Sequence, residues 1–317
     1  MKFLIPLLPL LFGFLLDALF GDPYRLPHPI RLIGTLIAKL EVWVRMHFKN
    51  LRAGGGLLCL TVLLLSAGVP LVLLVVCYHV HMVLGVAVES VLCYYLLAAR
   101  CLRDESMKVC CAMEQQDTEG ARYAVSMIVG RDTKPLDGEG ILRAAVETVA
   151  ENTSDGVTAP LFYMAFGGAV LGFFYKAANT MDSMLGYRNE KYGELGFIPA
   201  KLDDVLNYIP SRLTALLMCL AAFLCGLDGR AAFRIWKRDH RKHASPNSAQ
   251  TEAACAGALH VRLAGDAWYG GILHKKDYIG NNDCPVTPDT IRRANRLMYV
   301  TAVLMLVLCC VVRGVLF

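Results

Sequence analysis

The segment from Leu57 to Tyr78 constrains the fold of this chain most, because it contains no charged residue. A helix of about 20 apolar residues is long enough to cross the hydrocarbon core of a bilayer. The runs Met82 to Ala99, with Glu89 as its single charge, and Val157 to Tyr175, with none, have a similar length. All three runs are solidly apolar instead of alternating, so they predict helices and not the strands of a barrel.

Composition supports the same class of protein. Of 317 residues, 56% are hydrophobic and 19% are charged, which is more apolar than an ordinary soluble domain. We therefore predict an all-α, polytopic helical integral membrane protein with cytoplasmic helical loops, formed as a single membrane-embedded domain over residues 1–317. The predicted apolar runs are 3–20, 57–78, 82–99, 157–175, 213–227 and 297–316, and the predicted soluble loops are 21–56, 100–156, 176–212 and 228–296.

The positions of Lys and Arg predict the orientation of the loops. The loop 21–56 is rich in both, whereas the connector His79 to His81 has neither, so the longer loop is predicted to be cytoplasmic. The net charge of +5 is then explained by loop orientation and contact with anionic lipid, without a nucleic-acid partner. If 157–175 and 213–227 both cross the membrane, 176–212 lies outside. If they are re-entrant or buried, it stays cytoplasmic, which we favour.

Two glycine- and proline-rich stretches predict breaks near the first loop. In residues 21–34, GDPYRLPHPIRLIG, the prolines predict a rigid turn without helix that fixes Asp22 and His28. A simple membrane-exit loop explains the same residues. Gly54 to Gly56 predict a flexible joint before the second apolar run.

The stretch from Lys176 to Arg212 is unusually polar for a segment between apolar runs. Carboxylate and amide oxygens gathered on helical faces suit Mg²⁺, which commonly arrives bridging phosphates. An interhelical loop with caps and solvated charges is the competing interpretation. The side chains in question are Lys176, Asn179, Asp182, Ser183, Asp203, Asp204, Asn207 and Arg212.

Two further turns carry candidate site residues. ENTSDG, residues 151–156, is either an ordinary helix cap or presents Glu151, Asn152 and Asp155 to a cation or a phosphate. Ser245 to Asn247 predict a turn that leads into a small-residue helix from about Thr251 to Leu259. A helix start beside Arg and His favours an anion. Neither a Walker A pattern nor a complete GxGxxG is present in the sequence.

Five blocks in order, FGDPYRLPHPIRLIG, ETVAENTSDGVTAPLFY, KAANTMDSMLGYR, KLDDVLNYIPSRL and HASPNSAQTEAACAGAL, resemble the adenosylcobinamide-phosphate synthase family, the CobD/CbiB membrane proteins of cobalamin biosynthesis. The resemblance covers nearly the whole chain. It implies ATP-dependent amide ligation of adenosylcobyric acid with (R)-1-amino-2-propanol phosphate, or with aminopropanol, in the inner (cytoplasmic) membrane of a bacterial cell. The sequence departs from the expected pattern at Ser248-Ala249 and at Ala264 to Asp266, which bears on the contacts of that loop.

The implied chemistry assigns candidate roles. ATP and Mg²⁺ are the implied cofactors and a corrinoid is the substrate, because activating a carboxylate with ATP requires phosphate charge to be screened and held. A base must take a proton from the amine, and Glu151, Asp155 and His243 are left open for this role. The predicted metal ligands are Asp182, Asp203, Asp204, Asn179 and Asn207. The predicted substrate- or phosphate-binding residues are Asp22, His28, Asn152, Lys176, Arg212, Ser245 and Asn247, with His243 as a further phosphate candidate.

Two other functions remain open at this level. A Mg²⁺-dependent membrane prenyltransferase also places Asn and Asp on helices to hold diphosphate, and NTMD with LDDVLN resembles that device, but the repeated Asp spacing is missing. A transporter or assembly scaffold would line a pathway with polar residues such as Glu89. The expected partners are adenosylcobyric acid, aminopropanol phosphate, the lipid bilayer and other cobamide-assembly enzymes.

Overall fold

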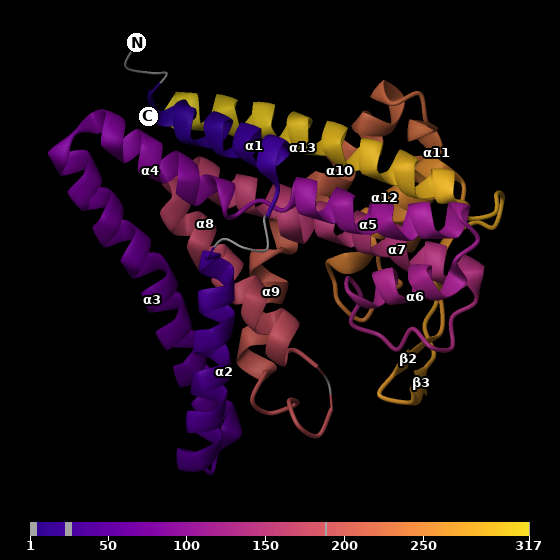
Figure 1. The fold of residues 1–317 in the computed structure, drawn as a ribbon, viewed down its shortest axis with the longest axis horizontal. Coiled ribbons are helices and arrows are strands. Elements are labelled where there is room, and N and C mark those ends of the chain that lie inside the picture. Colours follow the sequence, from indigo (N-terminus) through magenta and orange to yellow (C-terminus); the bar gives the residue numbers. More distant parts are fainter. Residues whose placement is uncertain (1–4, 23–26, 188, 317) are drawn as a thin grey trace. The chain divides into compact units, whose positions relative to one another are not determined.

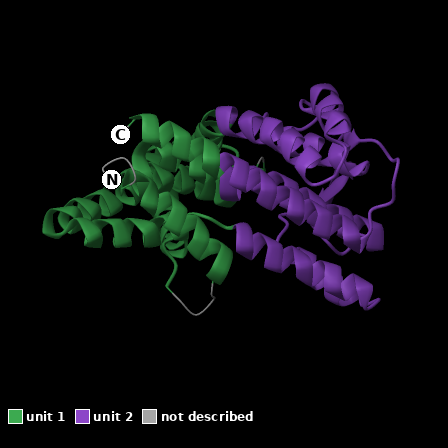
Figure 2. Cartoon of the chain, turned by 90° about the horizontal axis from the view of Figure 1, so that it is seen from above, with its two compact units in different colours: residues 1–98, 159–207, 306–317 green, residues 99–158, 208–305 purple. Residues whose placement is uncertain are grey.

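The computed structural model describes residues 5–22, 27–187 and 189–316. The chain divides into two compact units, each built from separate stretches of sequence (Figures 1 and 2). Unit 1 comprises residues 1–98, 159–207 and 306–317, and unit 2 comprises residues 99–158 and 208–305. The single membrane-embedded domain expected from the sequence stays a prediction.

The regular secondary structure of unit 1 is all helical in the part that the structure describes, with turns and loops between the helices. Its helices pack mainly as the pairs α1 with α4, α3 with α4, α3 with α8 and α8 with α9. Its elements are the short 3₁₀ turn η1 (Ile5–Leu7), α1 (Leu8–Phe20), α2 (Pro29–His47), α3 (Leu51–Val80), α4 (Met82–Tyr94), α8 (Ala159–Leu185), α9 (Phe197–Leu206) and the end of α13 (Pro288–Leu316).

The length and apolar character of the helices confirm the predicted class. Among the described residues, four helical stretches are long and apolar enough to cross a membrane, and a fifth is reached if α9 and α10 (Tyr208–Leu224) together form one broken span. The four stretches are Leu51–Val80, Met82–Glu114, Gly138–Leu185 and Pro288–Leu316. The chain is therefore an all-α polytopic membrane protein.

Helix α3 shows how an uncharged sequence divides its surface. Leu58 and Val62 are buried in unit 1, whereas Leu64 and Val72 are each 64% exposed. A contiguous exposed apolar face of this kind is unstable in water, so it is the face that lipid covers. The predicted joint at Gly54 to Gly56 is wrong, because α3 runs through it. A Cβ on Gly55 would lie 2.1 Å from the Leu195 carbonyl oxygen, so the glycine serves close packing.

The predicted turn at residues 21–34 is also wrong from residue 29 onward. Pro29 occupies the start of α2, where a missing N–H costs nothing and the fixed φ suits a helix. His28 is the N-cap, and its Nδ1 accepts a hydrogen bond from the Ile30 amide at 3.2 Å. The loop 21–56 thus consists largely of helix α2. Residues 23–26, which include Pro23, lie outside the described residues.

Glu89 lies inside unit 1, as expected for a carboxylate in an apolar helix. It accepts a hydrogen bond from the Tyr78 hydroxyl at 2.6 Å. Arg313 approaches it to 3.7 Å and donates to the Met164 carbonyl oxygen at 2.9 Å. Gly168 breaks α8 beside this pair with φ +57°, and a Cβ there would lie 2.1 Å from Glu89 Oε1. The pair accounts for Glu89 as a structural group.

Unit 2 is built around α12, in which every residue from Ser248 to Leu259 is buried. Its small side chains permit close contact, since a Cβ on Gly257 would lie 2.6 Å from the Ala231 carbonyl oxygen. The elements of unit 2 are α5 (Ala99–Glu114), α6 (Thr118–Ser126), α7 (Gly138–Asn152), the π turn η2 (Thr153–Thr158), α10, α11 (Gly229–Asp239), α12 (Ser248–Leu259), β1 (Arg262–Ala264), β2 (Ala267–Tyr269), β3 (Ile272–His274), β4 (Tyr278–Gly280) and the first part of α13.

Two details of unit 2 differ from the sequence predictions. The strands form two antiparallel pairs, β1 with β4 and β2 with β3, and no strand was predicted. Residues 151–156, ENTSDG, are helical. Helix α7 ends at Asn152, the π-helical segment η2 follows directly, and α8 continues from it. A π turn inserts an extra residue per turn and commonly accompanies functional sites. The helix after Ser245 to Asn247 begins at Ser248, earlier than the predicted Thr251.

Candidate functional site

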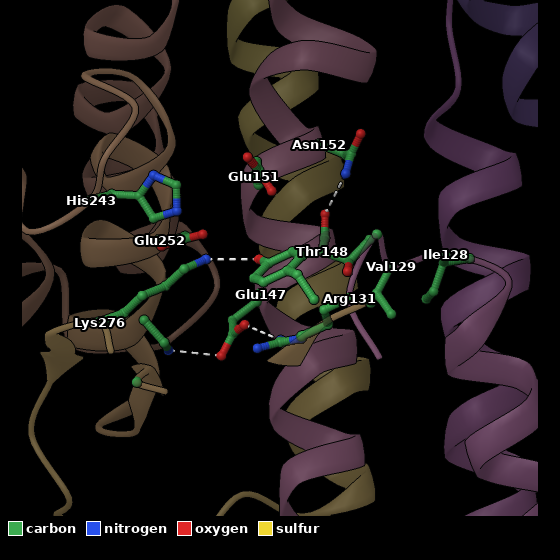
Figure 3. Close-up of a pocket in the computed structure, with 14 residues that line it drawn as sticks. Ile128, Val129, Arg131, Glu147, Thr148, Glu151, Asn152, His243, Glu252 and Lys276 are labelled. Carbon is green, nitrogen blue, oxygen red and sulfur yellow. Dashed lines mark hydrogen bonds and ion pairs between the residues drawn. The ribbon is translucent and has the colours of Figure 1, made fainter. Parts of the chain in front are cut away.

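A polar pocket of about 130 Å³ lies in unit 2 between α7, α12 and the segments around Arg131 and Lys276 (Figure 3). It combines three carboxyl groups, two cationic side chains and one histidine. Such a mixture of charges is typical of a catalytic or binding pocket. The labelled lining residues are Ile128, Val129, Arg131, Glu147, Thr148, Glu151, Asn152, His243, Glu252 and Lys276.

Glu147 and Arg131 form one wall of the pocket. Arg131 Nη2 pairs with Glu147 Oε2, and the backbone N–H of Ala264 donates to Glu147 Oε1 at 2.7 Å. Glu147 is buried. Both of its oxygens are therefore engaged, which fits a positioning role and leaves the other two carboxyl groups for chemistry.

Glu151 and Glu252 face the pocket from α7 and α12. The Ser248 hydroxyl donates to Glu151 Oε1 at 2.8 Å. Glu252 is only 5% exposed, and its Oε2 has no hydrogen-bond partner among the described residues. Burial first, and then the charges of Glu151 and Glu147, raise the pKa of the Glu252 carboxyl well above its usual range. The raised pKa favours the neutral, protonated form of Glu252, beside a carboxyl group that accepts a hydrogen bond from Ser248.

His243 has its protonation fixed by the backbone. The Ser245 N–H donates to His243 Nδ1 at 3.0 Å, so in the neutral ring the proton lies on Nε2. Burial lowers the pKa of His243, and this outweighs the opposing effect of Glu151. His243 is thus a neutral donor whose lone pair is already used, and Glu151 becomes the stronger candidate for the base.

Lys276 supplies the second cation of the pocket. Its Nζ donates to the Tyr269 hydroxyl at 2.8 Å (Figure 3). With Arg131 engaged by Glu147, Lys276 is the cation whose partner is a neutral oxygen. Together with His243 Nε2–H, it can hold an anionic group near Glu151.

Asn152 and Asp155, the other two candidates in residues 151–156, differ in their relation to the pocket. Asn152 lines the pocket, and its Nδ2 donates to the Thr148 carbonyl oxygen at 3.0 Å. Asp155 lies in η2 and is not among the residues that line the pocket. The structure therefore brings together two of the three base candidates, Glu151 and His243.

The predicted phosphate residues of unit 2 lie next to one another. Arg212 Nη1 donates to Asn247 Oδ1 at 3.2 Å, and Nη2 approaches the Pro246 carbonyl oxygen at 3.4 Å. The Asn247 N–H donates to Ser245 Oγ at 3.3 Å. Arg212 thus fastens the turn that precedes α12, and the binding role of these residues stays a prediction.

In unit 1, the predicted metal ligands form a hydrogen-bonded group around Asp203. Asn207 Nδ2 donates to both Asp203 oxygens at 3.0 Å, and Asn179 Nδ2 lies 3.4 Å from Oδ1. Tyr175 donates to Asn207 Oδ1 at 2.8 Å. The amides thus turn N–H groups to the carboxylate, whereas Mg²⁺ prefers oxygen ligands.

The remaining aspartates do not complete a metal shell. Asp204 pairs with Lys201 at 2.8 Å, and the Asp182 carbonyl oxygen accepts the Gly186 N–H at 2.7 Å. No group of three or more His, Cys, Asp or Glu placed to hold a metal is found in the described part of the chain. These residues do not fit a preformed Mg²⁺ site, and the metal assignment stays a prediction.

Three other predicted binding residues lie in unit 1. His28 Nε2 and Asp22 Oδ1 are 3.2 Å apart, and both side chains are largely buried. The capping bond to Ile30 and this pair explain His28 structurally. Lys176 lies on α8, one turn before Asn179. A binding role for the three stays a prediction.

Comparison with known proteins decides the family. Residues 10–298 match the family model described as CobD/Cbib protein. The chain belongs to the CobD/Cbib family. This result confirms the resemblance seen in the sequence. The matched region includes both the pocket of unit 2 and the Asp203 group of unit 1.

Relatives across the CobD/Cbib family are similar over nearly their full length. A protein of Clostridium perfringens (strain 13 / Type A) is 43% identical over 98% of this chain and 99% of its own. One from Geobacter metallireducens is 48% identical over 95% of both chains, and one from Pelobacter propionicus is 46% identical over 93% and 91%. Each is named "Cobalamin biosynthesis protein CobD". No solved structure matches the chain.

Sequence reasoning missed Arg131, Glu147, Glu252 and Lys276 in this CobD/Cbib chain. One signal was available for Glu252, because it is the single charged residue of the small-residue helix α12, and a carboxyl buried among alanines needs a reason. The other three come from loops and helices whose approach depends on the tertiary fold.

Proposed function

We propose that this CobD/Cbib chain joins a carboxyl group of a corrinoid to the amine of aminopropanol or its phosphate, with ATP as the driving reagent. The family membership supports a role in cobalamin biosynthesis. The observation that carries the reaction is the pairing, in one pocket, of the hydrogen-bonded carboxylate Glu151 with the neutral acid Glu252. Amide formation needs such a division, because the amine must lose a proton as it attacks.

The pocket suits an amino alcohol as the nucleophile. An ammonium group is attracted by Glu151, whose Oε1 is held by Ser248. Glu151 takes the proton, the free amine attacks the activated carboxyl carbon, and the bond from that carbon to the activated oxygen breaks, so that the oxygen leaves with the activating group. ATP supplies that activation when bound. His243 Nε2–H and Lys276 donate to the oxygen on which negative charge develops.

The neutral form of Glu252 avoids charge repulsion with Glu151 in the pocket. A second charged carboxylate beside Glu151 would repel it in a buried pocket. As a neutral acid, Glu252 tolerates burial and offers an O–H donor to the substrate. Since the described residues do not fit a metal shell, we derive no step through Mg²⁺. The inner membrane is the proposed location.

The proposal is tested with the purified full-length protein in detergent. Adenosylcobyric acid is incubated with ATP and Mg²⁺ and with either aminopropanol phosphate or aminopropanol, and the corrinoid is followed by mass. The expected result is a product whose mass equals acid plus amine minus water, and which is lost when ATP or amine is omitted. Absence of that product with either amine, from protein shown to be folded and monodisperse, would refute the proposal.

A further inference from the structure

A second cavity, which we call the basic cavity, lies in unit 2 and has a volume of about 420 Å³. Among the residues that the structure describes, two arginines and two histidines line it and no carboxylate does. The neighbouring pocket of Figure 3 has the opposite character, with three carboxyl groups. The residues that line the basic cavity are Tyr208, Arg212, His240, Arg241, His243, Ala244, Pro246 and Gln250.

The charges of the basic cavity are not neutralised by the protein. Within the described residues, no carboxylate lies within ion-pair distance of Arg212 or Arg241, although other cations of the same region are paired. Arg238 and Lys242, for example, both contact Asp239, at 2.7 and 2.8 Å. Arg212 bonds only to neutral oxygens and stacks on the Tyr208 ring with 3.6 Å from guanidinium carbon to centroid. Two uncompensated guanidinium groups in a cavity attract an anion.

The wall of the basic cavity is preorganised. Trp236 Nε1 donates to Gln250 Oε1 at 2.9 Å, which turns Gln250 Nε2 toward the Pro246 carbonyl oxygen at 3.1 Å. Arg212 holds the same turn through Asn247 and Pro246. Arg212 and Gln250 are therefore held in place, which limits the entropy lost when a ligand binds.

We infer that the basic cavity binds a phosphate group. A phosphate matches the forked geometry of guanidinium, and its charge balances that of Arg212 and Arg241. His243 lines both the basic cavity and the polar pocket of Figure 3. A phosphate bound here lies on one side of His243 and the amine on the other. The inference deepens the proposed function and rests on it for the identity of the reaction, but phosphate binding itself requires no turnover.

Three sources share this chemistry: ATP, a phosphorylated amino alcohol and an anionic lipid headgroup. Their binding to the full-length protein in detergent distinguishes them, by calorimetry with ATP or aminopropanol phosphate and by titration with phosphatidylglycerol. The test variants are Arg212→Gln and Arg241→Gln, with Arg241→Lys as the charge-conserving form. Arg230→Gln is the matched control, because Arg230 is exposed on α11 and does not line the cavity.

The expected result is about a tenfold loss of affinity for each of Arg212→Gln and Arg241→Gln, since a charge-assisted hydrogen bond contributes at this level. Arg230→Gln changes affinity by less than about twofold and Arg241→Lys restores part of it. The probe whose affinity responds identifies the source. Exposed Arg241 is replaced without disturbing the fold, so unchanged affinity for all three probes in Arg241→Gln would overturn the inference. If phosphate binding depends on the arginines but the protein has no ligase activity, the inference stands and only the proposed reaction is refuted.

Discussion

The Ser248 hydroxyl donates to the Glu151 carboxylate at 2.8 Å, from the first residue of α12 to the last turn of α7. Through this bond Ser248 orients the proposed base. Glu151 itself lines the pocket.

The substitution Glu151→Gln tests the base. The amide keeps the size of the side chain but takes no proton, so turnover should fall by about 10²- to 10⁴-fold. The matched control is Glu139→Gln in the first turn of α7, where Glu139 pairs with Arg143 at the surface. Product formation is measured at fixed substrate concentrations for both variants. Equal activity of Glu151→Gln and wild type would contradict the assignment.

Glu252 predicts a pH dependence of stability. Its folded pKa is raised above the unfolded value of about 4.5, so the folded state binds the extra proton between the two pKa values. Wild type therefore loses stability as pH rises above about 4.5 through the folded pKa. Glu252→Gln, which stays neutral, should gain in melting temperature relative to wild type as pH increases. Thermal unfolding in detergent between about pH 5 and 9 measures this, and a constant difference across that range would argue against a neutral Glu252.

Asp239 predicts a pH dependence of stability in the opposite direction, with stability lost as the pH falls. Burial raises its pKa, but hydrogen bonds from Arg238, Lys242 and the Gly280 N–H outweigh burial and lower the pKa to about 2. The resulting stability, about 2 kcal/mol, is present above pH 3.8 and is lost as pH falls toward 2. Asp239→Asn should remove it at neutral pH. Unfolding midpoints of wild type and variant should converge in acid, and a pH-independent gap would contradict this account.

Breaking the ion pair between Glu89 and Arg313 is expected to lower the folding stability of unit 1. Arg313→Gln leaves the buried Glu89 with the Tyr78 hydroxyl as its main partner, and breaking a buried pair costs about 3–5 kcal/mol. The double variant Glu89→Gln, Arg313→Gln should recover much of that stability, because no charge remains. Melting temperature and monodispersity in detergent report the effect. A double variant as unstable as the sum of the two single variants would show that the pair is not coupled.

Asp203 provides a test of the predicted metal site. Asp203→Ala leaves the amides of Asn207 and Asn179 without their acceptor, at a cost of about 1–3 kcal/mol. If the group is structural, the loss in melting temperature is the same in EDTA and in Mg²⁺. A rise in the melting temperature of wild type with Mg²⁺ that is absent in Asp203→Ala would instead establish magnesium at this group.

The sequence predicted the parts of the fold that depend on composition along the chain. Uncharged runs of about 20 residues become helices in lipid because every backbone group is then satisfied internally. Local rules failed where the surroundings decide. Pro29 begins a helix instead of breaking one. Gly54 and Gly55 lie inside α3, where Gly54 faces Val44 and Gly55 faces the backbone of Leu195.

The site was predicted only in part, for a related reason. Glu151, His243 and Asn152 came from turn-like motifs, and the structure places them in one pocket. Arg131 lies in the loop before α7 and Lys276 is far from both in sequence, so their approach to Glu151 depends on how unit 2 folds. Helical spacing suggested a metal cluster at the aspartates 182, 203 and 204. Spacing does not reveal that Asn207 bonds to Asp203 and that Lys201 pairs with Asp204, and the metal assignment stays a prediction.

The most direct test of the account is formation of the corrinoid amide by wild type and by Glu151→Gln in one experiment. Folded wild-type protein should convert adenosylcobyric acid to the amide only when ATP and the amine are both present, and Glu151→Gln should convert it at least about 100-fold more slowly. A product that forms without ATP, or equally fast in the variant, would contradict the account.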